Sequence, residues 1–120
     1  MTRPAPDQHP RLFIRVMIGK DGKLGPGKVA LLEGIAAQGS IAKAAAAMKM
    51  SYRRAWLLVK ATEELVGKPV VETAIGGAEG GGARLTKTGK AVVAAYREIE
   101  REAANGARAS LEALAKLAKT

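Results

Sequence analysis

The chain has 120 residues, no cysteine, an aromatic content of 3% and a formal net charge of +9. This length fits a single domain, and a core of small aliphatic side chains indicates a mainly α fold with a small β component. The lack of cysteine excludes disulfides, cysteine-ligated zinc and iron–sulfur clusters and fits a cytoplasmic compartment, while the positive charge favours an anionic partner.

The N-terminal region is predicted to combine a disordered head with a short β-hairpin. Residues 1–10 contain three Pro, no apolar periodicity and no apolar core of a signal peptide. Within residues 11–18 every second residue is Leu, Ile or Val. In an extended chain these side chains share one face, which predicts a half-buried strand. Asp21 and Gly22 are the residue types of a two-residue hairpin turn. No stretch of the chain approaches the roughly 20 apolar residues of a membrane span.

Three helices are expected next. A Pro in the first turn and a helical stripe of apolar residues predict a helix over about 26–38. Ser40 can cap a second helix over 41–47, which is rich in Ala and therefore permits close packing. Ser51 can cap a third helix over 52–66. Two helices joined by a four-residue turn are typical of a helix-turn-helix.

A hairpin and a long helix complete the chain. Residues 70–75 are β-prone, residues 76–82 form a Gly-rich tip, and residues 83–85 supply the return arm. Thr86 can cap a last helix of about 30 residues, which would extend about 45 Å if it were straight. The pair Asn105-Gly106 indicates a kink or a break into two helices.

The last helix is predicted to form a homodimer, because its distal apolar stripe would be stranded in a monomer. The expected interface residues are Val92, Tyr96, Ile99, Ala103, Leu111, Leu114 and Leu117. In this view residues 1–10 are the head, residues 11–86 are a winged helix-turn-helix domain, and residues 87–120 are a dimerisation helix of the same folding unit.

A basic surface is expected on the helix-turn-helix. Between Gly39 and Thr62 the chain has five Lys or Arg and no Asp or Glu, which suits double-stranded DNA. In this motif the first turns of the second helix enter the major groove. The candidate DNA-binding residues are Ser40, Lys49, Ser51, Tyr52, Arg53, Arg54, Trp56, Lys60, Gly80, Gly81, Gly82, Arg84 and Lys87.

Several of these positions have two interpretations. Arg53 is the first choice for base readout because it suits bidentate pairing with guanine; the alternative is that Arg53 and Arg54 contact phosphate or lie on a solvated face. Trp56 fits either a DNA contact or core packing. The tip over 76–82 is either a wing near phosphates or the minor groove, or a simple hairpin loop.

Catalysis is not expected. The single histidine, His9, lies in the head, and the acidic residues, including Glu63, occupy helix positions predicted to be solvated. They have no partners with metal-ligand spacing. The glycines do not match a nucleotide-binding pattern, because no Gly-rich loop runs from a strand into a helix with the required spacing.

From about Arg11 to Ala103 the chain resembles the N-terminal DNA-binding domain of the molybdate-responsive ModE regulators, which are themselves similar to LysR-type winged helices. The segments that carry this resemblance are Gly-Ser-Ile at 39–41, Ser-Tyr-Arg-Arg-Ala-Trp at 51–56, Gly-Gly-Ala-Glu-Gly-Gly-Gly-Ala at 76–83 and Leu-Thr-Lys-Thr-Gly at 85–89.

The resemblance implies a homodimeric transcription regulator with a recognition helix at 51–66, a wing at 76–82 and dimerisation after Thr86. In that family molybdate is bound by C-terminal β-rich domains, and this sequence ends at Thr120 before any such domain. No cofactor is therefore expected in this chain. The leading hypothesis is a regulator that binds a palindromic DNA site; the alternatives are a non-specific architectural DNA-binding protein and a protein-interaction module that uses the last helix.

Overall fold

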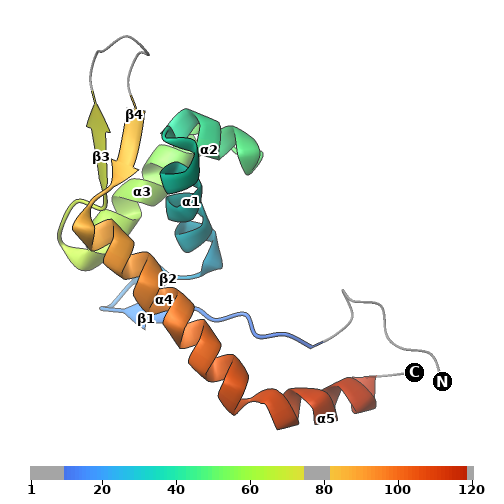
Figure 1. Ribbon diagram of the computed structural model, residues 1–120. Helices are drawn as coiled ribbons and strands as arrows, with labels where there is room; N and C mark the ends of the chain where they lie inside the picture. Colours follow the sequence, from blue (N-terminus) through green and yellow to red (C-terminus); the bar gives the residue numbers. More distant parts are fainter. Residues whose placement is uncertain (1–9, 75–81, 119–120) are drawn as a thin grey trace.

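The computed structural model describes residues 10–74 and 82–118. Its elements, shown in Figure 1, are β1 (Val16–Ile18), β2 (Gly22–Leu24), α1 (Pro26–Gln38), α2 (Ile41–Ala47), α3 (Tyr52–Val66), β3 (Val71–Ala74), β4 (Gly82–Leu85), α4 (Lys87–Gly106) and α5 (Arg108–Ala118). The strands form two separate two-stranded antiparallel sheets, β1 with β2 and β3 with β4. The predicted class, mainly α with a small β component, is confirmed.

The N-terminal hairpin is shorter than predicted. Only Val16–Ile18 of the expected strand over 11–18 pairs, because its partner β2 has three residues before the chain turns into α1. The expected turn at Asp21-Gly22 is also wrong, since Gly22 lies in β2 opposite Ile18. The chain reverses at residues 19–21 instead, where Gly19 adopts the positive φ of 69° that glycine tolerates.

The predicted bounds of the first three helices are confirmed. The hydroxyl of Ser40 accepts a hydrogen bond from the Lys43 amide at 3.2 Å, and Ser51 accepts one from the Arg54 amide at 3.1 Å. Both are N-caps that satisfy an otherwise unpaired amide of the first turn. Helix α1 ends at Gly39, whose amide donates to the Ile35 carbonyl, and α3 ends in the same way at Gly67.

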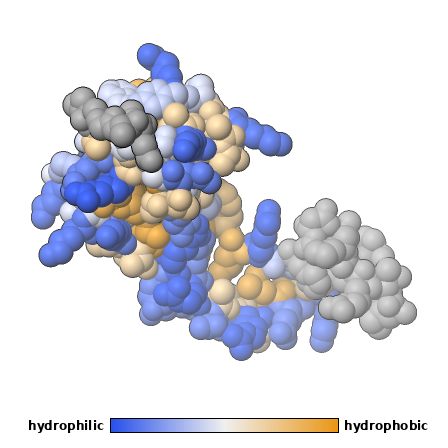
Figure 2. Space-filling model, turned by 45° about the horizontal axis from the view of Figure 1, so that its top comes forward, coloured by the Kyte–Doolittle hydropathy of each residue, from blue (hydrophilic) through white to orange (hydrophobic). Residues whose placement is uncertain are grey.

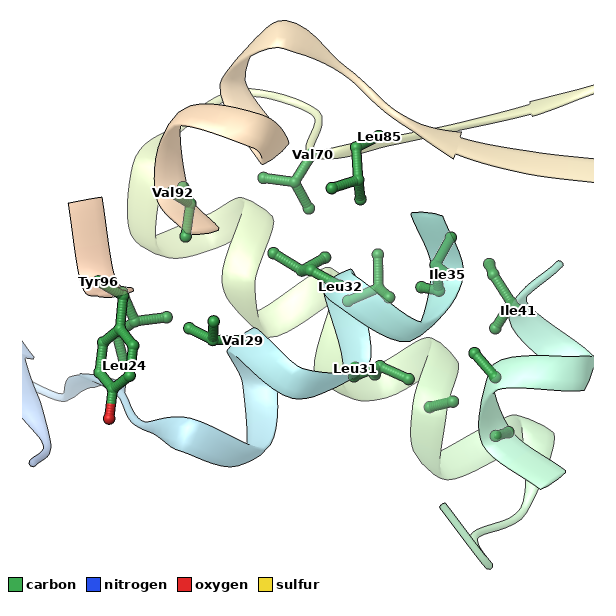
Figure 3. Packing of buried hydrophobic residues seen from close by; sticks show 14 residues of the cluster. Leu24, Val29, Leu31, Leu32, Ile35, Ile41, Val70, Leu85, Val92 and Tyr96 are labelled. Carbon is green, nitrogen blue, oxygen red and sulfur yellow. The ribbon is translucent and has the colours of Figure 1, made fainter. Parts of the chain in front are cut away.

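The core lies where α1, α2 and α3 meet the first half of α4 and the base of the β3–β4 hairpin (Figure 3). Its fully buried members include Leu31, Leu32 and Ile35 from α1 and Val70 from the segment before β3. Small residues bring α1 and α2 together, because a Cβ added at Gly34 would lie 3.4 Å from the Cβ of Ala44. The Ala-rich sequence of α2 thus allows the close crossing that a helix-turn-helix needs.

The β3–β4 hairpin stands beside α2 and α3 (Figure 1) and is held at its base. The Ala83 amide donates to the Gly39 carbonyl at 2.8 Å, and the Thr86 amide donates to the Val70 carbonyl at 3.0 Å. Thr86 also caps α4 as predicted, since its hydroxyl accepts from the Gly89 amide at 3.0 Å. These bonds fix the hairpin root against the ends of two helices.

Helix α4 is anchored to the rest of the domain through its first half. Tyr96 is fully buried and donates its hydroxyl hydrogen to the Ile14 carbonyl at 2.6 Å. Arg97 contacts both carboxylate oxygens of Glu33 on α1, at 2.6 and 3.0 Å, and also Glu100 at 2.6 Å. The hydrogen bond from Arg97 holds the pKa of the Glu33 carboxyl below its ordinary value.

One expectation about the C-terminal region is wrong, and one open alternative is decided. Val92 and Tyr96 were expected at a dimer interface, but they are 9% and 0% exposed and belong to the core of the chain itself. The region is also not one straight helix, because α4 ends at Gly106 and α5 starts at Arg108. Of the two alternatives expected near Asn105-Gly106, a kink or a break, the structure has a break into two helices, and α5 turns away from the axis of α4 (Figure 1).

No helix in the described parts of the chain is both long and apolar enough to cross a membrane.

Candidate nucleic-acid interface

The turn between α2 and α3 is built by backbone bonds and two half-buried methionines. The amides of Met48 and Met50 both donate to the Ala45 carbonyl, at 3.1 and 3.0 Å, and both side chains pack against the core. Between them Lys49 adopts a positive φ of 57°, which is unusual for a residue with a Cβ. The turn therefore holds the Lys49 side chain at the surface, between the two helices.

Helix α3 divides into a buried and an exposed face. Ala55, Val59 and Thr62 face the core, and the Thr62 hydroxyl is satisfied by the Leu58 carbonyl at 2.8 Å. The residues at the start of α3 that were expected to contact DNA are all exposed: Ser51, Tyr52, Arg53, Arg54 and Trp56. The structure thus brings the candidate readout residues onto the outward side of one helix.

Trp56 lies at the surface rather than in the core, with 43% of its area exposed. The ammonium of Lys60, one turn further on, lies 5.4 Å from the centre of the Trp56 ring, close enough for a cation–π interaction. The same ammonium is 3.1 Å from Oε1 of Glu63. The Lys60 ammonium therefore interacts with two neighbours on its own helix.

Glu63 has a structural role that the sequence analysis missed. Its Oε2 accepts a hydrogen bond from the Val70 amide at 2.9 Å, so it connects α3 to the root of the β3–β4 hairpin. Burial opposes ionisation of Glu63, but the bonds from Val70 and Lys60 outweigh it and hold the pKa of this carboxyl below its ordinary value. The prediction that Glu63 is simply solvated is wrong.

A groove of about 410 Å³ separates the start of α2 and α3 from the β3–β4 hairpin. Among the described residues its lining has no charged side chain and combines two aromatic rings with small residues: Ser40, Ile41, Ala42, Tyr52, Trp56, Thr73, Ala74, Gly82 and Ala83. Tyr52 and Trp56 are one helical turn apart and form the aromatic side of the groove. A linear polymer with apolar edges would therefore fit between the helix and the hairpin.

The remaining candidates lie on or after the hairpin. Gly82 pairs with Ala74 in the sheet, and Lys87 is exposed at the start of α4. Arg84 is exposed but donates to Oε2 of Glu72 on the neighbouring strand. Gly80 and Gly81 lie outside the described residues, as does most of the Gly-rich tip.

Leu57 is a surface residue that the sequence analysis did not select. It is 48% exposed and follows Arg53 by one helical turn, so both side chains lie on the side of α3 that faces away from the core. The signal was present in the sequence, because Leu57 falls opposite the Ala55, Val59 and Thr62 stripe. An exposed Leu beside an Arg can supply an apolar contact to a thymine methyl group.

The described part of the chain contains no group of three or more His, Cys, Asp or Glu residues placed to hold a metal ion.

The fold is that of a winged helix DNA-binding domain. A solved structure of the DNA-binding domain of CbnR in complex with DNA matches it with a TM-score of 0.57 and 23% sequence identity. The match covers 73% of this chain and 95% of that chain. At this level of identity the likeness establishes the fold.

The sequence comparisons then identify the relatives, and the chain is homologous to the N-terminal region of ModE, MopA and MopB proteins. It is 46% identical over 78 residues to the molybdenum-pterin-binding protein MopB of Rhodobacter capsulatus, covering 65% of this chain and 29% of that protein. Identity to the molybdenum transport protein ModE of Herbaspirillum seropedicae is 43% over 72 residues, covering 60% and 27%.

The DNA-binding transcriptional dual regulator ModE of Escherichia coli K12 is 38% identical over 71 residues, covering 59% of this chain and 27% of that protein. The resemblance to ModE regulators predicted from the sequence is thereby confirmed. The chain spans less than a third of the length of these relatives. No protein-family model matches it.

Proposed function

We propose that this chain is a DNA-binding transcriptional regulator that recognises a two-fold symmetric duplex site as a homodimer. The observation that carries the proposal is the exposure of Arg53 and Arg54 on the capped first turn of α3. Arg53 and Leu57 read base edges in the major groove, and Lys49 contacts phosphate. The names of the ModE relatives support a regulatory role.

The groove between α3 and the hairpin fits this proposal. One sugar–phosphate strand lies between the helix and the wing, with its deoxyribose edges against Tyr52 and Trp56. Its phosphates are contacted by basic side chains such as Lys87. All the contacts in this proposal come from protein side chains and backbone.

The proposal is tested by selecting bound sequences from a random duplex library with the purified protein at near-physiological salt, with and without molybdate. A specific regulator enriches a palindromic motif whose half-sites lie about one helical turn, or a multiple of it, apart. Tight, salt-sensitive binding without any enriched motif would instead identify a non-specific architectural protein.

Replacing Ser51 separates folding from DNA binding. The variant Ser51→Asp keeps the N-cap of α3 and adds a negative charge that the helix dipole favours, so the melting temperature is expected to stay within a few degrees. The same charge beside the phosphates is expected to weaken duplex binding about tenfold. The neutral cap Ser51→Asn is the control and should retain both properties. Equal DNA affinity of the two variants would exclude this helix end from the interface.

The arm formed by α4 and α5 supports the dimer. Helix α5 has no buried residue, and apolar area is exposed at Ile99, Leu114 and Leu117, with 38%, 52% and 80% of each side chain open to solvent. In Figure 2 the arm is hydrophilic along its outer edge and hydrophobic on its inner side. The interface that we propose comprises Ile99, Ala103, Leu111, Leu114 and Leu117.

Charged residues on this stripe are expected to give a monomer. In the variant Leu114→Glu with Leu117→Glu the interface would bury two carboxylates, and light scattering should report half the wild-type mass. Binding to a palindrome should weaken at least about 100-fold while affinity for one half-site is retained, because the two domains no longer bind together. The control Lys116→Glu changes the net charge by the same amount and should remain dimeric. A dimeric double variant contradicts the proposed interface.

A further inference from the structure

The β3–β4 hairpin carries an ion pair on its outer face. Glu72 and Arg84 are directly opposite each other in the antiparallel register. The flanking pair, Val71 and Leu85, alternates to the other face, where Leu85 is 8% exposed and belongs to the core. The side chains of Glu72 and Arg84 therefore lie together in solvent, with 53% and 81% of their areas exposed.

The guanidinium of Arg84 is held through two of its nitrogens. Nε and Nη2 both donate to Oε2 of Glu72, at 3.3 and 3.2 Å. These are the donors that a guanidinium offers to a phosphate group, so the carboxylate of Glu72 and a DNA phosphate compete for the same atoms. An exposed ion pair of this kind is weak, so one substitution can change whether Arg84 pairs with Glu72 or with a phosphate.

The Glu72–Arg84 pair lies on the hairpin that borders the candidate DNA-binding groove. The other face of the hairpin lines the groove beside Trp56, through Thr73 and Ala83. From Gly39 to Thr62 the adjoining helices contain no acidic residue. Within the described part of the hairpin, Glu72 therefore supplies negative charge next to an otherwise basic surface.

We propose that Glu72 restrains Arg84 and thereby lowers the affinity of this domain for the phosphate backbone of any duplex. The inference rests on the proposed DNA-binding function and extends it. A chain with a net charge of +9 is attracted to all DNA, and a carboxylate on the wing reduces this sequence-independent attraction without disturbing α3. Glu72 is thus a residue that sets how strongly binding depends on salt.

The test compares Glu72→Gln with Glu98→Gln. Glu98 is the matched control, because it is 54% exposed and is likewise paired with an arginine, Arg101, at 2.9 Å. Both variants change the net charge equally, and neither removes a buried group. Affinity for a scrambled duplex is measured by fluorescence anisotropy across a salt series, with thermal unfolding as the check on folding.

Glu72→Gln is expected to bind the scrambled duplex about three- to tenfold more tightly at low salt, with a salt dependence steeper by about 0.9 in log–log slope, as one added phosphate contact predicts. Glu98→Gln should stay within about twofold of wild type. In an Arg84→Gln background, Glu72→Gln should also change affinity by no more than about twofold, because no guanidinium is left to release.

The proposal that Glu72 restrains Arg84 would be overturned if the two Gln variants had equal effects on duplex affinity. It would also be overturned if the full gain in affinity persisted in the Arg84→Gln background. Failure of the wild-type protein to bind any duplex would instead remove the proposed function itself. The two failures are therefore distinguishable.

Discussion

Reversing the charge of Arg53 and Arg54 together is expected to weaken duplex binding at least about 100-fold. The variant Arg53→Glu with Arg54→Glu replaces attraction by repulsion where α3 enters the groove. Both side chains are exposed, and only the backbone amide of Arg54 takes part in the Ser51 cap. Acidic residues in a first helical turn are favourable, so the fold should be retained.

The matched control for this variant lies at the other end of α3. Lys20 and Lys23 are exposed on the N-terminal hairpin, and Lys23 lines a separate hollow with Leu65 near the end of the helix. Lys20→Glu with Lys23→Glu changes the net charge by the same amount. Its affinity at near-physiological salt should fall by less than about tenfold, because only long-range attraction is lost. Equal losses in the two variants would mean that net charge, and not α3, determines binding.

Gly89→Ala is expected to cause a large loss of stability. A Cβ at Gly89 would overlap the carbonyl oxygen of Val70. That carbonyl is fixed, because it accepts from the Thr86 amide while the Val70 side chain is fully buried. The overlap should cost at least about 2 kcal/mol in the free energy of unfolding, which exceeds the gain of about 1 kcal/mol from replacing Gly in a helix.

Gly106→Ala is the control for that substitution. Gly106 also lies in α4, but a Cβ there would meet nothing within 4 Å. This variant should raise the free energy of unfolding by up to about 1 kcal/mol, since alanine favours helix. Urea denaturation measures both changes, and a Gly89→Ala variant as stable as Gly106→Ala would show that the hairpin root can shift away from α4.

The helix-turn-helix could be predicted closely because its boundaries depend on local chemistry. Ser40, Ser51 and Thr86 each satisfy an amide of the helix that follows them, and Gly39 and Gly67 each end a helix with a positive φ. Such caps act within about four residues, so one sequence is enough to recognise them.

The errors arose where a local pattern competed with pairing or packing over a longer distance. The alternation over residues 11–18 is real, yet a strand needs a partner, and β2 offers only three residues. The stripe on α4 cannot by itself distinguish a surface that meets a second chain from one that meets α1. Tyr96 illustrates this, because its hydroxyl bonds to Ile14, which is 82 residues away in the sequence.

The exposed face of α3 could be predicted from local spacing, but the contacts around it could not. Exposure of Arg53 and Arg54 follows from their spacing against Ala55 and Val59 on α3. Contacts that link different elements, such as Glu63 with the Val70 amide or Arg84 with Glu72, depend on where the chain returns after a turn. No local signal in the sequence indicates these pairings.

The measurement that tests the central claim most directly is the base preference of Arg53→Ala. Its affinity is measured for the selected duplex and for every single-base variant of it, with Lys49→Gly alongside as a phosphate-contact control whose glycine suits the φ of 57°. If α3 reads bases, Arg53→Ala loses discrimination of about 1–3 kcal/mol at one position of each half-site, whereas Lys49→Gly weakens all duplexes alike. A uniform loss in both variants would contradict base readout by Arg53.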